Sequence, residues 1–127
     1  MSINPTALKR NIKIQFLKEG LHRYPRAATD EALESVKYLG DTHFHYFYFY
    51  VTVQVFHNDR DLEFQMFRRW CESLYRDGVM EIDFQSCEML SENLINQIND
   101  KYPGRDITVE VYEDNINGAV LHYSAGQ

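Results

Sequence analysis

Two histidines stand two residues apart at the start of the most aromatic stretch of this 127-residue chain, in the sequence His43-Phe44-His45. In a β-strand alternate side chains lie on one face, which places the Cβ atoms of the two histidines roughly 6–7 Å apart. Such a pair can chelate one metal ion when a third ligand comes from elsewhere. His22 lies just past the first predicted strand and can reach the same end of the sheet. The alternative is a pair of histidines at a strand end, satisfied by ordinary hydrogen bonds.

The segment from His43 to Phe56 predicts one long strand, because aromatic and β-branched residues dominate it without a helical period. Beyond the two histidines, one face of this strand is apolar and consists of Phe47, Phe49, Val51, Val53 and Val55. The opposite face carries Tyr46, Tyr48 and Tyr50. Tyrosine rings are half polar, so we expect this face to be covered by another subunit or by a ligand.

Five strands are expected in all, at residues 11–17, 43–56, 61–64, 106–113 and 119–124. The segment 18–42 has no clear period and predicts a long surface connection with a short helical turn near residues 30–37. Residues 57–60 are a turn by composition, which would join the second and third strands as a hairpin, and residues 115–118 form the last turn.

Two amphipathic helices are expected between the third and fourth strands, at residues 66–75 and 87–101. Ser86 is the predicted N-cap of the second helix, and residues 79–85 are a brief connection between the two. Three strands, two helices and two strands predict a single α+β domain over residues 1–127. It would consist of an antiparallel sheet with its two helices on one face.

Composition restricts the classes of partner. A hydrophobic content of 44% and a charged content of 25% are ordinary for a globular domain. The net charge of −6 argues against a nucleic-acid partner. No apolar run approaches the length that spans a bilayer, which predicts a protein without a membrane partner. Two cysteines and no apolar leader segment predict a reduced, cytoplasmic compartment.

Several motifs, taken in order, resemble the 6-pyruvoyltetrahydropterin synthase and 6-carboxytetrahydropterin synthase family, which has the tunnelling fold. That family carries a histidine after its first strand, an H-x-H at the head of the second, a short "MDF" return, a T-S-E-N-like helix start and a V-x-V-x-E strand. The matching segments here are His22 in FLKEGLHRY, His43-Phe44-His45, Leu62-Glu63-Phe64, Ser86-Cys87-Glu88-Met89 and Val109-Glu110-Val111-Tyr112-Glu113. Ser91-Glu92-Asn93 is closer to T-S-E-N in its letters, but it leaves the helix too short before Pro103. The resemblance spans roughly residues 11–124.

This resemblance implies a zinc site with three ligands, His22, His43 and His45, and an open fourth position. It also implies that Glu113 accepts hydrogen bonds from the amino and ring N–H groups of a pterin or purine-like ligand, since a carboxylate matches two parallel donors. Cys87 and Glu88 would line the same substrate site at the start of the helix. Subunits of the family join edge to edge, so the resemblance further implies a homo-oligomer.

The chain also departs from the family pattern. Leu39 stands four residues before the H-x-H, where these synthases usually have a catalytic cysteine. They also relay protons through an Asp and a His before the second helix, and here that segment holds Asp83 without a histidine. His57 or Asp41 could substitute as the base. Cys71 and Cys87 are expected to be apolar fillers, with a functional alternative for Cys87 because a helix N-terminus lowers the pKa of a thiol.

Three hypotheses follow. The first is a zinc-dependent lyase that acts on dihydroneopterin triphosphate or a related pterin- or purine-derived substrate, in tetrahydropterin or deazapurine (queuosine) biosynthesis. The second is a catalytically silent relative that binds a pterin or nucleobase-like ligand in the same pocket. The third treats the aromatic strand only as an oligomer interface.

Overall fold

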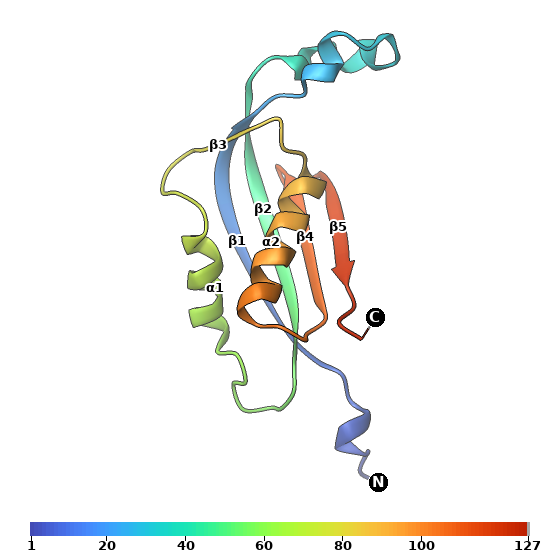
Figure 1. Ribbon diagram of the computed structural model, residues 1–127, viewed down its shortest axis with the longest axis vertical. Coiled ribbons are helices and arrows are strands. Elements are labelled where there is room, and N and C mark those ends of the chain that lie inside the picture. Colours follow the sequence, from blue (N-terminus) through green and yellow to red (C-terminus); the bar gives the residue numbers. More distant parts are fainter. Residues whose placement is uncertain (127) are drawn as a thin grey trace.

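A computed structural model describes residues 1–126 as a five-stranded sheet covered by two α-helices (Figure 1). The strands are β1 (Arg10–His22), β2 (His43–Val55), β3 (Met80–Asp83), β4 (Ile107–Glu113) and β5 (Asn117–Tyr123). The α-helices are α1 (Phe64–Ser73) and α2 (Cys87–Lys101). Three 3₁₀ helices lie outside the sheet: η1 (Pro5–Ala7), η2 (Pro25–Ala28) and η3 (Glu31–Gly40).

The spatial order of the strands is β3-β1-β2-β4-β5. Every neighbouring pair is antiparallel except β1 and β3, which are parallel, so the sheet is mixed and the purely antiparallel sheet we predicted is wrong in this respect. Both α-helices cover the same face, with α2 against β4 and β5 and α1 against β1 (Figure 1). The α+β class is therefore compatible with the structure.

The long central strand is confirmed. β2 pairs with β1 along its whole length, from Arg10 opposite Val55 to His22 opposite His43. Alternate residues from Phe47 to Val55 are buried against the helices, while their neighbours are partly exposed on the other face. The apolar side chains of β2 and β4 thus form the centre of the core. Phe47 is the residue of this core in β2 that lies nearest to the histidines.

The first strand is longer than predicted, and His22 is its last residue rather than a residue beyond it. The prediction ended at residue 17 because Gly20 interrupts the apolar pattern. A Cβ atom at Gly20 would lie 2.7 Å from the ring of Phe47, so this large ring fills the space that a side chain would need. The segment 18–42 is therefore partly strand, and the predicted helical turn belongs to η3, which projects with η2 from one end of the sheet (Figure 1).

The predicted strand at residues 61–64 and its hairpin are wrong. Residues 58–62 form turns and bends, and Glu63 caps α1 through hydrogen bonds from Gln65 N–H and Met66 N–H. The third strand is instead β3, inside the segment 79–85 that we predicted to be a connection. Four residues are too few to show a period, and β3 is defined by its pairing with β1.

The helix α2 and the strands β4 and β5 agree with the predictions from the sequence. The helix α2 begins at Cys87 and ends at Lys101, and the Ser86 hydroxyl accepts a hydrogen bond from Met89 N–H as an N-cap. The strands β4 and β5 differ from the prediction only at their ends. Because α2 starts where β3 ends, its first residues lie next to the end of β1.

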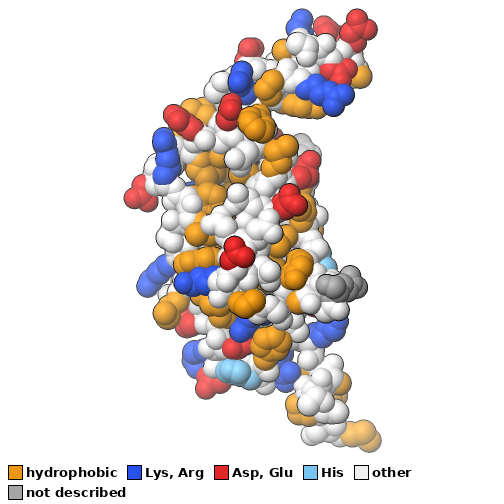
Figure 2. Space-filling model, in the orientation of Figure 1, with side chains coloured by type: hydrophobic (Ala, Val, Ile, Leu, Met, Phe, Trp, Pro, Cys, Tyr) orange, Lys and Arg blue, Asp and Glu red, His pale blue; other side chains and the backbone are white. Residues whose placement is uncertain are grey.

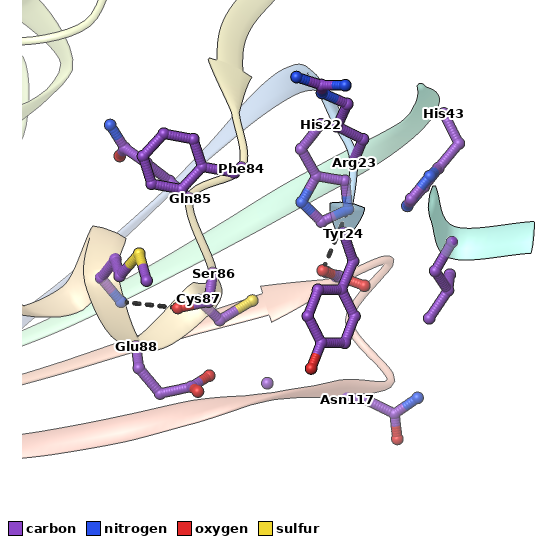
Figure 3. A pocket seen from close by; sticks show the side chains of 14 residues that line it. His22, Arg23, Tyr24, His43, Phe84, Gln85, Ser86, Cys87, Glu88 and Asn117 are labelled. Carbon is purple, nitrogen blue, oxygen red and sulfur yellow. Dashed lines mark hydrogen bonds and ion pairs between the residues drawn. The ribbon is translucent and has the colours of Figure 1, made fainter. Parts of the chain in front are cut away.

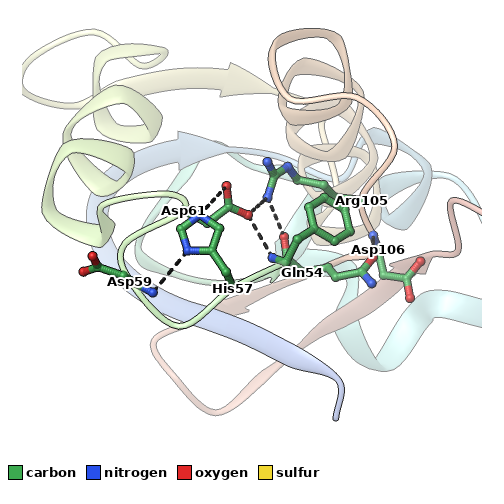
Figure 4. Close-up of polar contacts among 7 residues, drawn as sticks. Gln54, His57, Asp59, Asp61, Arg105 and Asp106 are labelled. Atoms are coloured by element: carbon green, nitrogen blue, oxygen red, sulfur yellow. Dashed lines mark hydrogen bonds and ion pairs between the residues drawn. The ribbon is translucent and has the colours of Figure 1, made fainter. Parts of the chain in front are cut away.

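A cluster of polar side chains joins the far end of β2 to the loop before β4 (Figure 4). Asp61 accepts hydrogen bonds from Phe56 N–H at 2.8 Å and from the Arg105 guanidinium at 2.9 Å. The side chains of Asp61 and Arg105 are only 16% and 13% exposed. The hydrogen bond from Arg105, followed by that from Phe56, lowers the pKa of the Asp61 carboxyl group.

Replacing Asp61 by asparagine is expected to lower the free energy of unfolding by about 1.5–3 kcal/mol at neutral pH, since hydrogen bonds to a charged group are lost. Because the pKa is lowered in the folded state, this stabilisation is complete above the ordinary value of 3.8 and is lost as the pH falls through the lowered pKa. Urea unfolding of both proteins across this pH range measures the effect. Asp59→Asn is the control, because that side chain is 86% exposed, and an equal loss in both variants would contradict the prediction.

Acidic and basic side chains are interspersed over the helix-covered face of the molecule (Figure 2). On the other face of the sheet, the rings of Phe44 and Tyr46 are 44% and 42% exposed. No helix within residues 1–126 is long and apolar enough to cross a membrane.

Candidate metal centre and adjoining cavity

The three histidines singled out in the sequence meet at one end of the sheet. His22 ends β1 and lies directly opposite His43, the first residue of β2, and His45 follows on the same face. One ring nitrogen from each of the three lies within 4.8 Å of the others. The register of β1 against β2 produces this arrangement.

The rings of His43 and His45 are each oriented by a hydrogen bond on one side. The Nδ1 of His43 lies 2.8 Å from the carbonyl oxygen of Asp41, which can only accept, so this Nδ1 carries the proton. The Nδ1 of His45 lies 2.5 Å from Oδ2 of Asp114, and the backbone of Gln85 near the ring of His22 acts to raise the pKa of that ring. With Nδ1 engaged in this way, the Nε2 atoms of His43 and His45 are the ones available to a metal ion, as in the carboxylate–histidine–metal arrangement of many metalloproteins.

The Nε2 atoms of His22 and His45 are buried, and neither has a hydrogen-bond partner among residues 1–126. A buried polar atom without a partner costs free energy unless something else contacts it. Burial, the largest influence, lowers the pKa of His22, although the nearby Glu113 carboxylate acts in the opposite direction. The neutral imidazole that results is the form that binds a metal ion.

Glu113 ends β4 beside this cluster. Its Oε1 lies 3.3 Å from Nε2 of His22, and its Oε2 lies 3.5 Å from Nε2 of His45. The side chain is 30% exposed. The predicted site residue Glu113 thus lies beside the histidine cluster as well as in the wall of the adjoining cavity.

A cavity of about 510 Å³ opens next to the cluster (Figure 3). Figure 3 shows the rings of His22 and His43 on one side and Ser86, Cys87 and Glu88, at the start of α2, on the other. Glu113 also lines it, so the structure brings together His22, His43, Glu113, Cys87 and Glu88. The family resemblance implies a common site for these residues.

Two alternatives for reactive groups are wrong, whereas the expectation of Cys87 as an apolar filler agrees with its burial. Burial raises the pKa of the Cys87 thiol to about 12, with Glu113 and Glu88 adding to the effect, so the helix N-terminus does not produce a thiolate here. His57 cannot serve as a base at this site. It lies 3.7 Å from Asp61, at the other end of β2, roughly 40 Å from His45 by the rise of the strand. Leu39 lines the cavity, and Asp41 contacts His43 through its backbone.

Sequence reasoning missed Asp114. It follows β4 in the left-handed region at φ 52°, where aspartate is one of the better tolerated residues. Its carboxylate accepts hydrogen bonds from Tyr46 N–H and from His45, and these two interactions lower its pKa. An acidic residue directly after the V-x-V-x-E strand was the available signal. Gln85, Tyr24 and Asn117 lacked such a signal because their positions depend on how β3, η2 and β5 pack.

The fold and the site define a class: a mixed α+β domain with three histidines, at one end of its sheet, that could hold a metal ion. Neither a scan against protein-family models nor a search of curated proteins finds a match to this chain.

Proposed function

We propose that this chain is a zinc-dependent, pterin-synthase-like lyase that acts on dihydroneopterin triphosphate or a related pterin- or purine-derived substrate. The observation that carries the proposal is the convergence of His22, His43 and His45 next to a cavity that also contains Glu113 and Glu88. These residues are far apart in the sequence, and each belongs to a segment that matches a motif of the family. The tunnelling fold belongs to the same proposal, supported by the strand plan and by both helices lying on one face.

Three neutral imidazoles suit zinc, and a site with three histidine ligands is typical of catalytic zinc. Bound zinc would polarise a hydroxyl or carbonyl group of the substrate. Glu88 and Glu113 provide carboxylate acceptors for the N–H groups of a planar heterocycle. The Cys87 thiol stays protonated and contributes only to the wall of the cavity.

A second candidate function is a catalytically silent relative that binds the same kind of ligand. Leu39 favours it, because an aliphatic side chain lines the cavity from the position where the family usually has its catalytic cysteine. Burial also raises the pKa of Cys71 to about 12, so both thiols of the chain stay protonated at neutral pH.

The test uses purified protein, His43→Ala and the control His122→Ala, which alters a histidine on β5 that contacts Thr108. Zinc content and the conversion of dihydroneopterin triphosphate are measured in each. The lyase proposal expects zinc and turnover in the wild type and the control, and neither in His43→Ala. Thermal stabilisation by a pterin without product would establish the silent binder instead. Near-zero zinc in all three proteins would contradict the lyase proposal.

A cytoplasmic homo-oligomer is part of this proposal. The exposed rings of Phe44 and Tyr46 and the edge strands β3 and β5 offer surfaces for a second copy. Cys71 and Cys87 are both free thiols in the described part of the chain, which fits a reducing compartment. Light scattering after size exclusion measures the assembly, and a clean monomer would contradict it.

A further inference from the structure

Glu113 lies close to the histidines, closer than it would need to be if it contacted only the substrate. In the register of β4 against β2 it lies opposite Phe47, two residues after His45. Its side chain lies on the same face of β4 as Ile107, Val109 and Val111, the face that packs into the core. The carboxylate is therefore directed toward the histidine cluster by the regular alternation of the strand.

Each carboxylate oxygen of Glu113 lies from one of two histidine nitrogens at a distance that two ligands of one metal ion can have. With metal–ligand bonds of about 2.0–2.2 Å in a tetrahedral site, neighbouring ligand atoms are about 3.3–3.6 Å apart. The carboxylate oxygens lie 3.3 Å from Nε2 of His22 and 3.5 Å from Nε2 of His45. Neither contact has the geometry of a hydrogen bond, since both Nε2 atoms are without a partner in the described chain.

We infer that Glu113 is the fourth protein ligand of the metal ion when no substrate is bound. The inference rests on the metal site proposed above and adds to it. With three imidazoles and one carboxylate, the coordination shell is closed by the protein. A ligand that binds the metal ion from the cavity must therefore displace this carboxylate, which then becomes free to accept hydrogen bonds from the ligand.

The experiment compares the wild type with Glu113→Gln and Glu113→Ala, after removal of bound metal. Zinc affinity is measured by competition with a chelator, and the visible absorption of the cobalt(II)-loaded protein reports coordination number. Glu110→Gln is the matched control, because it removes the same charge from the opposite face of the same strand. His43→Ala tests the metal site separately, and circular dichroism of each metal-free protein checks that it is folded.

We expect both Glu113 variants to bind zinc at least about tenfold more weakly than the wild type, with Glu110→Gln unchanged. The visible cobalt(II) absorption should change in position or intensity in the variants, because water would take the place of the carboxylate. Unchanged affinity and spectrum in both folded variants, while His43→Ala loses the metal, would overturn the role of Glu113 and leave the metal site intact. Absence of zinc and cobalt binding in the wild type would overturn both proposals.

Discussion

Zinc is expected to raise the unfolding temperature of the wild-type protein by about 10 °C when its free concentration is about one hundred times the dissociation constant. Binding to the folded state alone stabilises it by about 2.7 kcal/mol at that ratio, and each kcal/mol corresponds to roughly 3–5 °C for a domain of this size. The physical reason is local. The buried Nε2 atoms of His22 and His45 have no hydrogen-bond partner in residues 1–126, and a bound ion would contact them.

The variant His43→Ala should lose most of this shift, because two imidazoles remain of the three whose nitrogens approach one another. His122→Ala should retain it, since His122 lies on β5 and contacts Thr108 instead. Differential scanning calorimetry with and without a chelator measures all three proteins. The same zinc-induced shift in His43→Ala and the wild type would show that the ion binds elsewhere.

Replacing Asp114 by asparagine is expected to weaken zinc binding by about 10–100-fold, because Asp114 holds the ring of a proposed ligand, His45, in place. One carboxylate oxygen accepts from Nδ1 of His45 and the other from Tyr46 N–H. Asparagine has a single acceptor oxygen and must turn its NH₂ group toward one of these donors. The ring of His45 then loses either its orientation or its proton position, while the left-handed backbone remains acceptable to asparagine.

Chelator competition at constant pH measures this effect. Asp106→Asn is the matched control, because that carboxylate also accepts a backbone N–H, from Ala125, next to the start of β4. Equal zinc affinity in the wild type and Asp114→Asn would mean that His45 does not need this carboxylate. Equal losses in both variants would indicate a general loss of stability instead of an effect on the site.

Local patterns were sufficient for much of the fold. The alternation in residues 43–56 predicted β2 and its buried face, because every second side chain of a strand meets the core. Ser86 and the apolar spacing after it predicted α2 to the residue, since N-capping and the helical period are properties of neighbouring residues. For the site, the starting point was the family resemblance and not a local pattern. It implies a common site for His22, His43, Glu113, Cys87 and Glu88, and the structure places these residues around one cavity.

Non-local contacts decided the rest. The strand β3 is too short to have a detectable period and exists through its parallel pairing with β1. Residues 61–64 were predicted to form a strand, but Asp61 accepts a hydrogen bond from Arg105, which is 44 residues away in the sequence. The strand β1 continues past Gly20 because it pairs with β2 as far as His22 opposite His43, and the ring of Phe47 fills the space beside the glycine. Each of these contacts depends on a partner that a local window of sequence does not contain.

The sequence by itself determined which side chains could hold a metal ion and on which segments they lie. Only the tertiary structure decided how these side chains contact one another. It placed Asp114 on His45 and Glu113 between two imidazoles, and it buried Cys87 so that its thiol stays protonated. The reason is physical: residue type and strand period are local, whereas the distance between ligand atoms and the polarity around them depend on how β2, β4 and α2 pack together.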